Sequence, residues 1–561
     1  MPPFGYDLLW NVAAAKIVLA ASVVAAVVMI RFKTKPAWYV ALFGAATAFE
    51  YLFFVHGAGL MFWGIKGDEQ FVAAFLETVA AGHPFRDLTY AALPPFYPPL
   101  YFWIVGGIAW VFSWNGVQAA KLGTALSFAL LPIGSFFLQK RLWRSEKDDV
   151  RPSEWGLTLA SLAFLPALTW DAAVIKPYET VTALLGVQIG AFFLARSGDG
   201  LVWRSRIGYG AFFALLLATY YFWGFQLAIA AAIVFAVTKV GRMTRLREYP
   251  IAAAIALIGS SLFWLPYVLS FRYGFAPQQA TFLFEQDFDS FLPFLRFTPI
   301  GLLLAFGVVA LAYFRKERVF RALAALALAP VIWQTTGILV FAFGGRPPIP
   351  SKPLLYFGTA ALVTAAGWGV GRLRGDKWPS YLKTAVVVVA VVLAAAYSFA
   401  GTFIDDPLIR AAMFGMRSGS ARVAGLVAAF DSDKTLLAKT YLSSGLPDLS
   451  AFEPLDLFIQ PTIHFSHPAA DWPRRAEYLE RLAESGSADE FADSLAHAPW
   501  GPVDGLILYR QADSFVIYLQ DDAWPDGTKD RTIAFPVSLV DAAHWDTRTS
   551  IGNITLYVRH P

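Results

Sequence analysis

Long apolar segments recur along the first 400 residues, and their length constrains the fold more than any other feature of the sequence. A helix needs roughly 17–25 mostly apolar residues to cross the hydrocarbon of a bilayer. Twelve segments meet or approach this length, near residues 11–30, 37–56, 117–139, 156–173, 180–196, 207–222, 224–238, 250–270, 298–314, 319–342, 353–371 and 382–400. Only 15% of the residues are charged, against roughly 25% in soluble domains. The sequence therefore predicts a polytopic α-helical membrane protein with about twelve spans.

The composition changes after residue 400, where charged residues and turn dipeptides become frequent. Strand-like runs are predicted at Gly505–Tyr509, Phe515–Leu519, Ile533–Leu539 and Ile554–Val558, and helices at Trp472–Ser485 and Ser487–His497. We therefore expect a membrane domain over residues 1–400 and a soluble α+β domain over residues 401–561, an ordinary domain size.

The basic residues fix the predicted orientation, because Lys and Arg stay on the cytoplasmic side of a membrane. One set of alternate loops holds 23 Lys and Arg residues and the other set holds seven. This balance requires that Leu100–Phe112, an apolar run too short to span, lies in or dips into the outer interface. The N-terminus, a first outer loop at residues 57–116 and the tail are then extracytoplasmic.

The first outer loop carries an unusual concentration of charge for a lipid-embedded protein. Asp68, Glu69, Glu77, Arg86 and Asp87 precede a stiff proline- and aromatic-rich segment at 93–103. Charged groups near a bilayer are costly, so they indicate a functional site. A solvated surface loop is the alternative reading.

Other predicted outer positions add cations and carboxylates that could meet in one cavity. Lys121 lies one turn inside the third span, and Lys176-Pro-Tyr-Glu179 joins the fourth and fifth spans. Arg346 and Lys352 flank a proline-rich connection between the tenth and eleventh spans.

This set of residues suits glycosyl transfer from a lipid-linked phosphosugar. A carboxylate would take the proton of an acceptor hydroxyl, and cations would stabilise the leaving phosphate. The sequence holds no P-loop and no dinucleotide-binding unit, so neither a nucleotide nor a nucleic acid is an expected partner. Asp287-Phe-Asp289 resembles a metal-binding Asp-x-Asp, but we expect a surface loop there. His464 and His467 lack a third ligand in the sequence, so loop hydrogen bonding is expected rather than zinc.

The first outer loop resembles the priming galactan arabinofuranosyltransferases of mycobacterial cell-wall synthesis (AftA type), a family of C-type glycosyltransferases. The resemblance rests on Gly67–Phe71, Arg86–Tyr90 and Leu93–Pro99 with Phe102-Trp103, and extends to other positions that cover most of the chain: Lys121, Pro177-Tyr178, Trp264–Tyr267, His464, Pro468, Ala488–Phe491 and Pro499-Trp500. It implies a decaprenyl-phosphoryl-arabinofuranose donor, a galactan acceptor, inversion at the anomeric carbon, and a bacterial plasma membrane location. It also implies that Asp68 is the catalytic base.

The resulting prediction is an inverting arabinofuranosyltransferase with Asp68 as general base, and with Glu69 and Asp87 supporting the catalytic loop. Glu69 departs from the family pattern, and two adjacent buried carboxylates would raise each other's pKa, so it is expected to point away from Asp68. The predicted donor-phosphate ligands are Lys121, Arg86, Arg346, Lys352 and Lys176. The predicted sugar and acceptor contacts are Tyr97, Trp103, Tyr178, Glu179 and His464.

Three alternatives remain open from the sequence. One is a related transferase that uses another polyprenyl-phosphate sugar or another acceptor glycan. The others are a flippase for lipid-linked sugars and a non-catalytic scaffold for cell-wall assembly. No cofactor is required by the predicted chemistry, although a divalent cation is left open.

Overall fold

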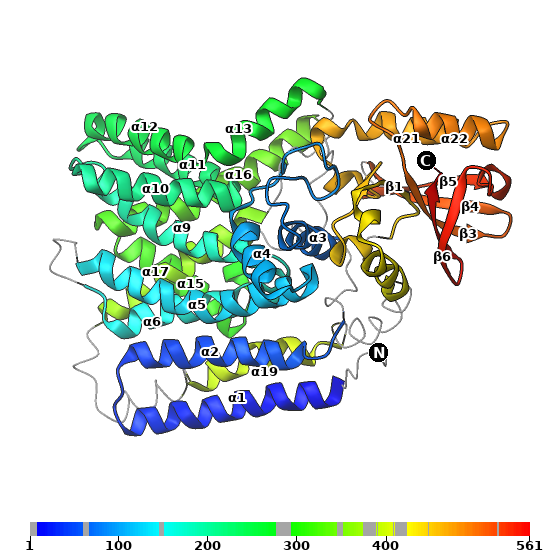
Figure 1. Cartoon of the computed structure of the whole chain (residues 1–561). Helices are drawn as coiled ribbons and strands as arrows, with labels where there is room; N and C mark the ends of the chain where they lie inside the picture. The colour runs from blue at the N-terminus through cyan, green and yellow to red at the C-terminus, as the bar shows by residue number, and fades with distance from the viewer. Residues whose placement is uncertain are drawn as a thin grey trace.

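A helical bundle and a sheet-containing tail lie side by side in the structure, a computed structural model (Figure 1). It describes residues 8–59, 67–144, 151–275, 293–344, 352–373, 389, 391–407, 409, 423–446, 448–523 and 527–560. Two helices of the first outer loop, α3 (Asp68–Ala80) and α4 (Leu100–Phe112), lie between the bundle and the tail (Figure 1).

The bundle is arranged around two helices that are buried on nearly every side, α9 (Pro177–Arg196) and α17 (Thr359–Arg372). A short π-helical turn, Leu354–Gly358, leads into α17. The other bundle helices are α1 (Leu8–Arg31), α2 (Pro36–Phe54), α5 (Gly116–Arg144), α6 (Glu154–Leu162), α7 (Phe164–Ala167), α8 (Trp170–Ile175), α10 (Trp203–Tyr220), α11 (Phe222–Val237), α12 (Arg242–Gly259), α13 (Ser261–Ser270), α15 (Pro299–Tyr313), α16 (Arg318–Gly344) and α19 (Phe399–Thr402).

The described parts of all twelve predicted spans contain helix, but not all of the helices are continuous. In the described part of the chain, six helices are long and apolar enough to cross a membrane, and the pair α12–α13 would make a seventh. That pair was predicted as one straight span, yet it bends by 72°. The predicted span at 156–173 is broken into α6, α7 and α8, and the predicted span at 382–400 is described at residues 389 and 391–400, of which 391–396 are helical. The number of twelve spans therefore stays a prediction.

The first outer loop contains the short helix expected at Leu100–Phe112, which is α4 with the same bounds. The helix α3 precedes it and begins at Asp68. Gly67, before this helix, has a φ of 55°, a conformation that side chains with a Cβ rarely adopt. This glycine turns the chain so that Asp68 is the first residue of α3.

The tail contains a seven-stranded mixed sheet in which the path β2-β1-β3-β4-β5 is joined by β6 and β7. The strands are β1 (Thr440–Ser443), β2 (Asp456–Leu457), β3 (Gly505–Gln511), β4 (Ser514–Ala523), β5 (Gly527–Pro536), β6 (Trp545–Ile551) and β7 (Ile554–Arg559). Helices α21 (Trp472–Leu482) and α22 (Ala488–Ala496) pack on one face, and the helix Val423–Ser432 packs on the other. The predicted helices and most predicted strands are confirmed, although the strand predicted to reach Leu539 ends at Pro536.

The tail is joined to the first outer loop along what we call the loop–tail seam, formed by Asp87–Ala91 of the loop and Asp456–Gln460 of the tail. The amide of Leu457 donates to the carbonyl of Thr89 at 2.9 Å, and the amide of Ala91 donates to Asp456 at 2.8 Å. Segments far apart in the sequence are thereby held together beside α3.

Candidate active site

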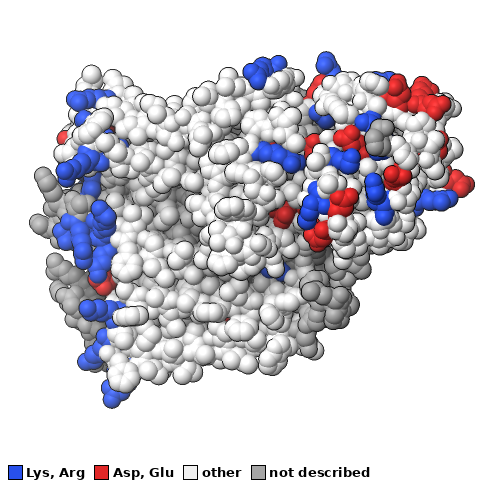
Figure 2. Space-filling view, in the orientation of Figure 1, with Lys and Arg blue, Asp and Glu red and all other residues white. Residues whose placement is uncertain are grey.

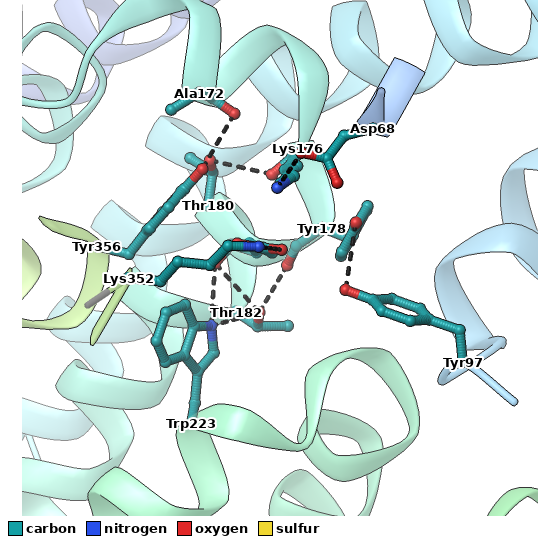
Figure 3. A network of polar contacts seen from close by, with 11 residues as sticks. Asp68, Tyr97, Ala172, Lys176, Tyr178, Thr180, Thr182, Trp223, Lys352 and Tyr356 are labelled. Atoms are coloured by element: carbon teal, nitrogen blue, oxygen red, sulfur yellow. Dashed lines mark hydrogen bonds and ion pairs between the residues drawn. The ribbon is translucent and has the colours of Figure 1, made fainter. Parts of the chain in front are cut away.

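Two carboxylates and two ammonium groups meet where α3 approaches the start of α9 (Figure 3). Asp68 accepts from Lys176 at 2.5 Å, and Lys352 lies 3.4 Å from Glu179. Lys176 also interacts electrostatically with Glu179, and the two ammonium groups repel one another. Each lysine thus has one close carboxylate partner, while the pair offers two positive charges in one place.

Local structure fixes the backbone of three of these four residues. Pro177 occupies the first turn of α9, where its missing N–H costs nothing. The carbonyl of Lys176 accepts from the amide of Glu179 at 3.1 Å and from that of Thr180 at 3.2 Å. Glu179 therefore faces into the bundle one turn after Lys176, and Asp68 opens α3.

Asp68 is held as an anion. Burial alone would raise its pKa, but the neighbouring ammonium groups of Lys176 and Lys352 outweigh that effect and lower the pKa of Asp68 to about 2. Its side chain still keeps 40% of its surface accessible, whereas that of Lys176 keeps 10%. The carboxylate is therefore reachable from solvent although it is paired.

Glu179 is fully buried among aromatic side chains. Of its two carboxylate oxygens, Oε1 faces Lys352, and Oε2 has no hydrogen-bond partner in the described part of the chain. Tyr97 and Tyr178 lie close by, with their hydroxyl oxygens 3.3 Å apart. Buried carboxylate oxygens without a partner are rare, so this oxygen is a candidate contact for a ligand hydroxyl.

Glu69 interacts with a different lysine from the one that contacts Asp68. It is buried and lies close enough to Lys121 of α5 to interact electrostatically. The Lys121 ammonium also donates to the carbonyl of Ala58. Lys121 thus has an anion and a carbonyl beside it, and no close contact links it to Asp68.

The tail contributes His464, which interacts electrostatically with Asp68 and both lysines of the site. Burial lowers the pKa of His464 to about 4, so the imidazole is neutral near pH 7. The next residue, Phe465, stacks on Phe71 of α3 with ring centroids 5.8 Å apart. This stacking holds the tail segment against the helix that carries Asp68.

Three further predicted site residues, Arg86, Asp87 and Trp103, also lie elsewhere in the structure. Arg86 and Asp87 are at the loop–tail seam, where Arg86 faces Asp456 and Asp87 accepts from the amides of Thr89 and Tyr90, both at 3.0 Å. Burial raises the pKa of Asp87 to about 7.

Trp103 was predicted to contact the sugar. Instead its indole donates to the carbonyl of Pro84 at 2.6 Å, and its ring packs on Phe85. These contacts brace the fold of the loop. The predicted phosphate ligand Arg346 lies outside the described residues.

The described residues include no cluster of three or more metal-ligand side chains. His467 accepts a hydrogen bond from the amide of Ala469 at 2.9 Å, which confirms the predicted loop role. Asp287 and Asp289 lie outside the described ranges.

Sequence reasoning missed three aromatic residues that enclose the site. Tyr220 and Tyr356 lie within electrostatic range of Glu179, and the Trp223 indole donates to the carbonyl of Glu179 at 3.1 Å and to Thr182 at 3.0 Å (Figure 3). The Tyr-Tyr-Phe-Trp-Gly run at 220–224 falls at the boundary between the predicted spans 207–222 and 224–238, where aromatic residues are common at membrane interfaces and carry no specific signal for a site.

Comparisons with known proteins identify the family to which the chain belongs. The family profile described as "Arabinofuranosyltransferase N terminal" matches residues 3–346, and "Arabinofuranosyltransferase A C terminal" matches residues 433–559. The chain is 27% identical over 543 residues to a galactan 5-O-arabinofuranosyltransferase of Mycolicibacterium smegmatis, covering 90% of this chain and 83% of the relative. It is 25% identical over 547 residues to one of Mycobacterium tuberculosis, covering 90% and 81%.

Among solved structures, ArnT from Cupriavidus metallidurans in the apo state is similar, with a TM-score of 0.51 and 17% identity over 85% of this chain and 94% of that chain. This similarity shows the C-type glycosyltransferase fold: a polytopic helical membrane protein, here with a C-terminal α+β domain. With both family profiles matched, the chain belongs to the arabinofuranosyltransferase family of membrane glycosyltransferases.

Proposed function

We propose that this protein is an inverting arabinofuranosyltransferase that moves arabinofuranose from decaprenyl-phosphoryl-arabinose to a hydroxyl of a cell-envelope galactan, as the priming step of arabinan synthesis. The observation that carries the proposal is the accessible Asp68 carboxylate beside two ammonium groups. The similarity to relatives named galactan 5-O-arabinofuranosyltransferases supports the acceptor and the sugar.

In this mechanism Asp68 accepts the proton of the galactan hydroxyl as that oxygen attacks the anomeric carbon. The bond from the anomeric carbon to the phosphate oxygen breaks, and its electron pair leaves with the decaprenyl phosphate. Lys176 and Lys352 stabilise the negative charge on the phosphate. Attack opposite the leaving group inverts the anomeric centre.

The buried carboxylate of Glu179 is proposed to accept a hydrogen bond from a sugar hydroxyl through Oε2. Tyr97 and Tyr178 would form the neighbouring wall, since aromatic faces suit the apolar side of a sugar ring. His464 of the tail would contact the acceptor next to Asp68.

The distribution of charge supports an extracytoplasmic site. Figure 2 shows Lys and Arg gathered at the end of the bundle far from the tail. Arg196 ends α9, the 20-residue helix that starts beside the site, so roughly 30 Å of helix separates the two. Basic helix ends favour the cytoplasmic side, which leaves the site and the tail outside.

The test is transfer by the purified protein in lipid nanodiscs, supplied with decaprenyl-phosphoryl-arabinose and a short galactan, followed by linkage analysis of the product. Asp68→Asn should lower kcat at least about 100-fold, since a positioned general base contributes 10²–10⁴-fold. Asp199→Asn is the matched control, because Asp199 is an exposed carboxylate paired with Arg318. Near-wild-type transfer by Asp68→Asn would refute the proposal, and transfer only to a different glycan would refute the galactan acceptor.

A further inference from the structure

The lysine that contacts the base also faces the place proposed for the phosphate, so the two anions would compete for its positive charge. Lys176 donates to Asp68 at 2.5 Å, while Lys352 lies next to it. We propose that Lys176 is a positioning residue that blocks Asp68 in the empty enzyme and releases it when the donor phosphate binds the Lys176 ammonium. This inference rests on the function proposed above.

The charges of the site decide which ion pair opens. Without a ligand, the charges of the two carboxylates and the two ammonium groups of the site cancel. A bound phosphodiester adds one negative charge, so one of the two carboxylates then lacks an ammonium group of its own. Glu179 is fully buried, whereas Asp68 keeps 40% of its side-chain surface accessible. Because an unpaired charge costs far more when it is buried, Asp68 is the carboxylate that is released.

The reach of Lys176 permits this exchange without movement of a helix. Its amide donates to the carbonyl of Ala172 at 3.0 Å, and its own carbonyl accepts from Glu179 and Thr180. The backbone is thus fixed at the junction of α8 and α9, while the four-carbon side chain can rotate. An anion between the two lysines would also relieve their mutual repulsion.

Movement of the Lys176 ammonium from Asp68 to the donor phosphate would raise the pKa of Asp68 once the donor is bound. A carboxylate with a pKa of about 2 is a weak proton acceptor, and general-base rates rise with basicity. Among the described residues, Asp68 also interacts electrostatically with Lys352, His464, Tyr178 and Tyr356. Of these four groups only Lys352 is charged near pH 7. Transfer of Lys176 to the phosphate would return the Asp68 pKa towards its ordinary value of about 4, so the donor would activate the base that uses it.

A donor without phosphate tests this coupling. Arabinofuranosyl fluoride, with the anomeric configuration of the lipid donor, needs no phosphate site for its leaving group: the acceptor oxygen bonds to the anomeric carbon, fluoride leaves with the C–F electron pair, and Asp68 takes the proton. With this donor and short galactan, wild-type transfer should be slow and should be stimulated by added dimethyl phosphate. Lys176→Met should be faster than wild type, about five- to tenfold for a Brønsted slope near one half, and should not respond to dimethyl phosphate.

Matched variants separate this inference from the proposed function. Lys140→Met removes an ammonium group that pairs with Glu154 away from the site, so this variant should stay as slow as wild type with the fluoride donor and should keep its response to dimethyl phosphate. Lys176→Arg should restore the slow, dimethyl phosphate-stimulated behaviour, and Lys176→Gln replaces Lys176→Met if the latter does not fold. If Lys176→Met is no faster than wild type while Asp68→Asn is inactive, the release model is wrong and the base assignment stands. If Asp68→Asn transfers from either donor at the wild-type rate, the proposed function itself is wrong.

Discussion

Tyr90→Phe should loosen the loop–tail seam while leaving the shape of the site intact. The hydroxyl of Tyr90 lies 2.9 Å from that of Ser466 and accepts from the amide of Gln460 at 3.2 Å. Both partners are buried. The ring of Tyr90, which the Arg475 guanidinium covers at 4.8 Å, is retained in the variant.

The cost follows from these two contacts. A hydrogen bond contributes about 0.5–1.5 kcal/mol net, and a buried amide left without an acceptor costs about 1–3 kcal/mol. We therefore expect the seam to lose about 2–3 kcal/mol, equivalent to roughly 30- to 150-fold in its opening equilibrium. Because His464 and Phe465 are held by the same tail segment, kcat should also fall.

Hydrogen–deuterium exchange in nanodiscs is the assay. Peptides that cover 87–93 and 456–466 should exchange faster by this factor, whereas peptides from α21 should not change. Tyr518→Phe is the matched control, since the Tyr518 hydroxyl makes one exposed contact, to Gln511 at 3.3 Å. Unchanged exchange in Tyr90→Phe would refute the view that this hydroxyl holds the tail to the loop.

Three further predictions concern stability. Arg475→Met should lower the Tm of the tail, because the buried guanidinium packs on three aromatic rings and donates to two carbonyl groups; Arg474→Met, at an exposed side chain, should leave Tm unchanged. Burial raises the pKa of Glu77 to about 8, so the folded protein holds a proton that the unfolded chain releases, and Tm should decline between about pH 5 and pH 8; Glu77→Gln should flatten that part of a Tm–pH series. Gly67→Ala should cost about 1–2 kcal/mol and reduce transfer, because its backbone is left-handed although nothing lies within 4 Å of the added methyl group; Gly107→Ala, also in open space but within α4, should preserve both Tm and activity.

The sequence predicts much of the bundle because span length and apolar composition are local properties. The helices α1, α2, α5, α9 and α16 appear close to their predicted bounds for that reason. The bend after Gly259 coincides with Gly259-Ser260-Ser261, and the break of 156–173 coincides with Pro166. Both are local signals for a kinked helix, but a prediction based on span length and apolar composition does not use them.

The residues of the candidate site also fall into those that the sequence predicts and those that only the folded chain reveals. The charge of Asp68 and Lys176 made both residues candidates, since charged side chains are rare near lipid. Their pairing joins residues more than 100 positions apart, so only the folded chain could reveal it. Tyr356 carries no such charge, and aromatic residues are common at membrane interfaces, so nothing in the sequence distinguished it.

The loop–tail seam has a consequence for the order in which the protein is synthesised and folded. His464 comes about 400 residues after Asp68 in the chain, which at 5–20 residues per second is roughly 20–80 seconds of ribosomal synthesis. A nascent chain can insert its membrane helices long before the seam exists. The proposed catalytic centre is therefore assembled last, and truncated or unfinished products carry Asp68 without its complete surroundings.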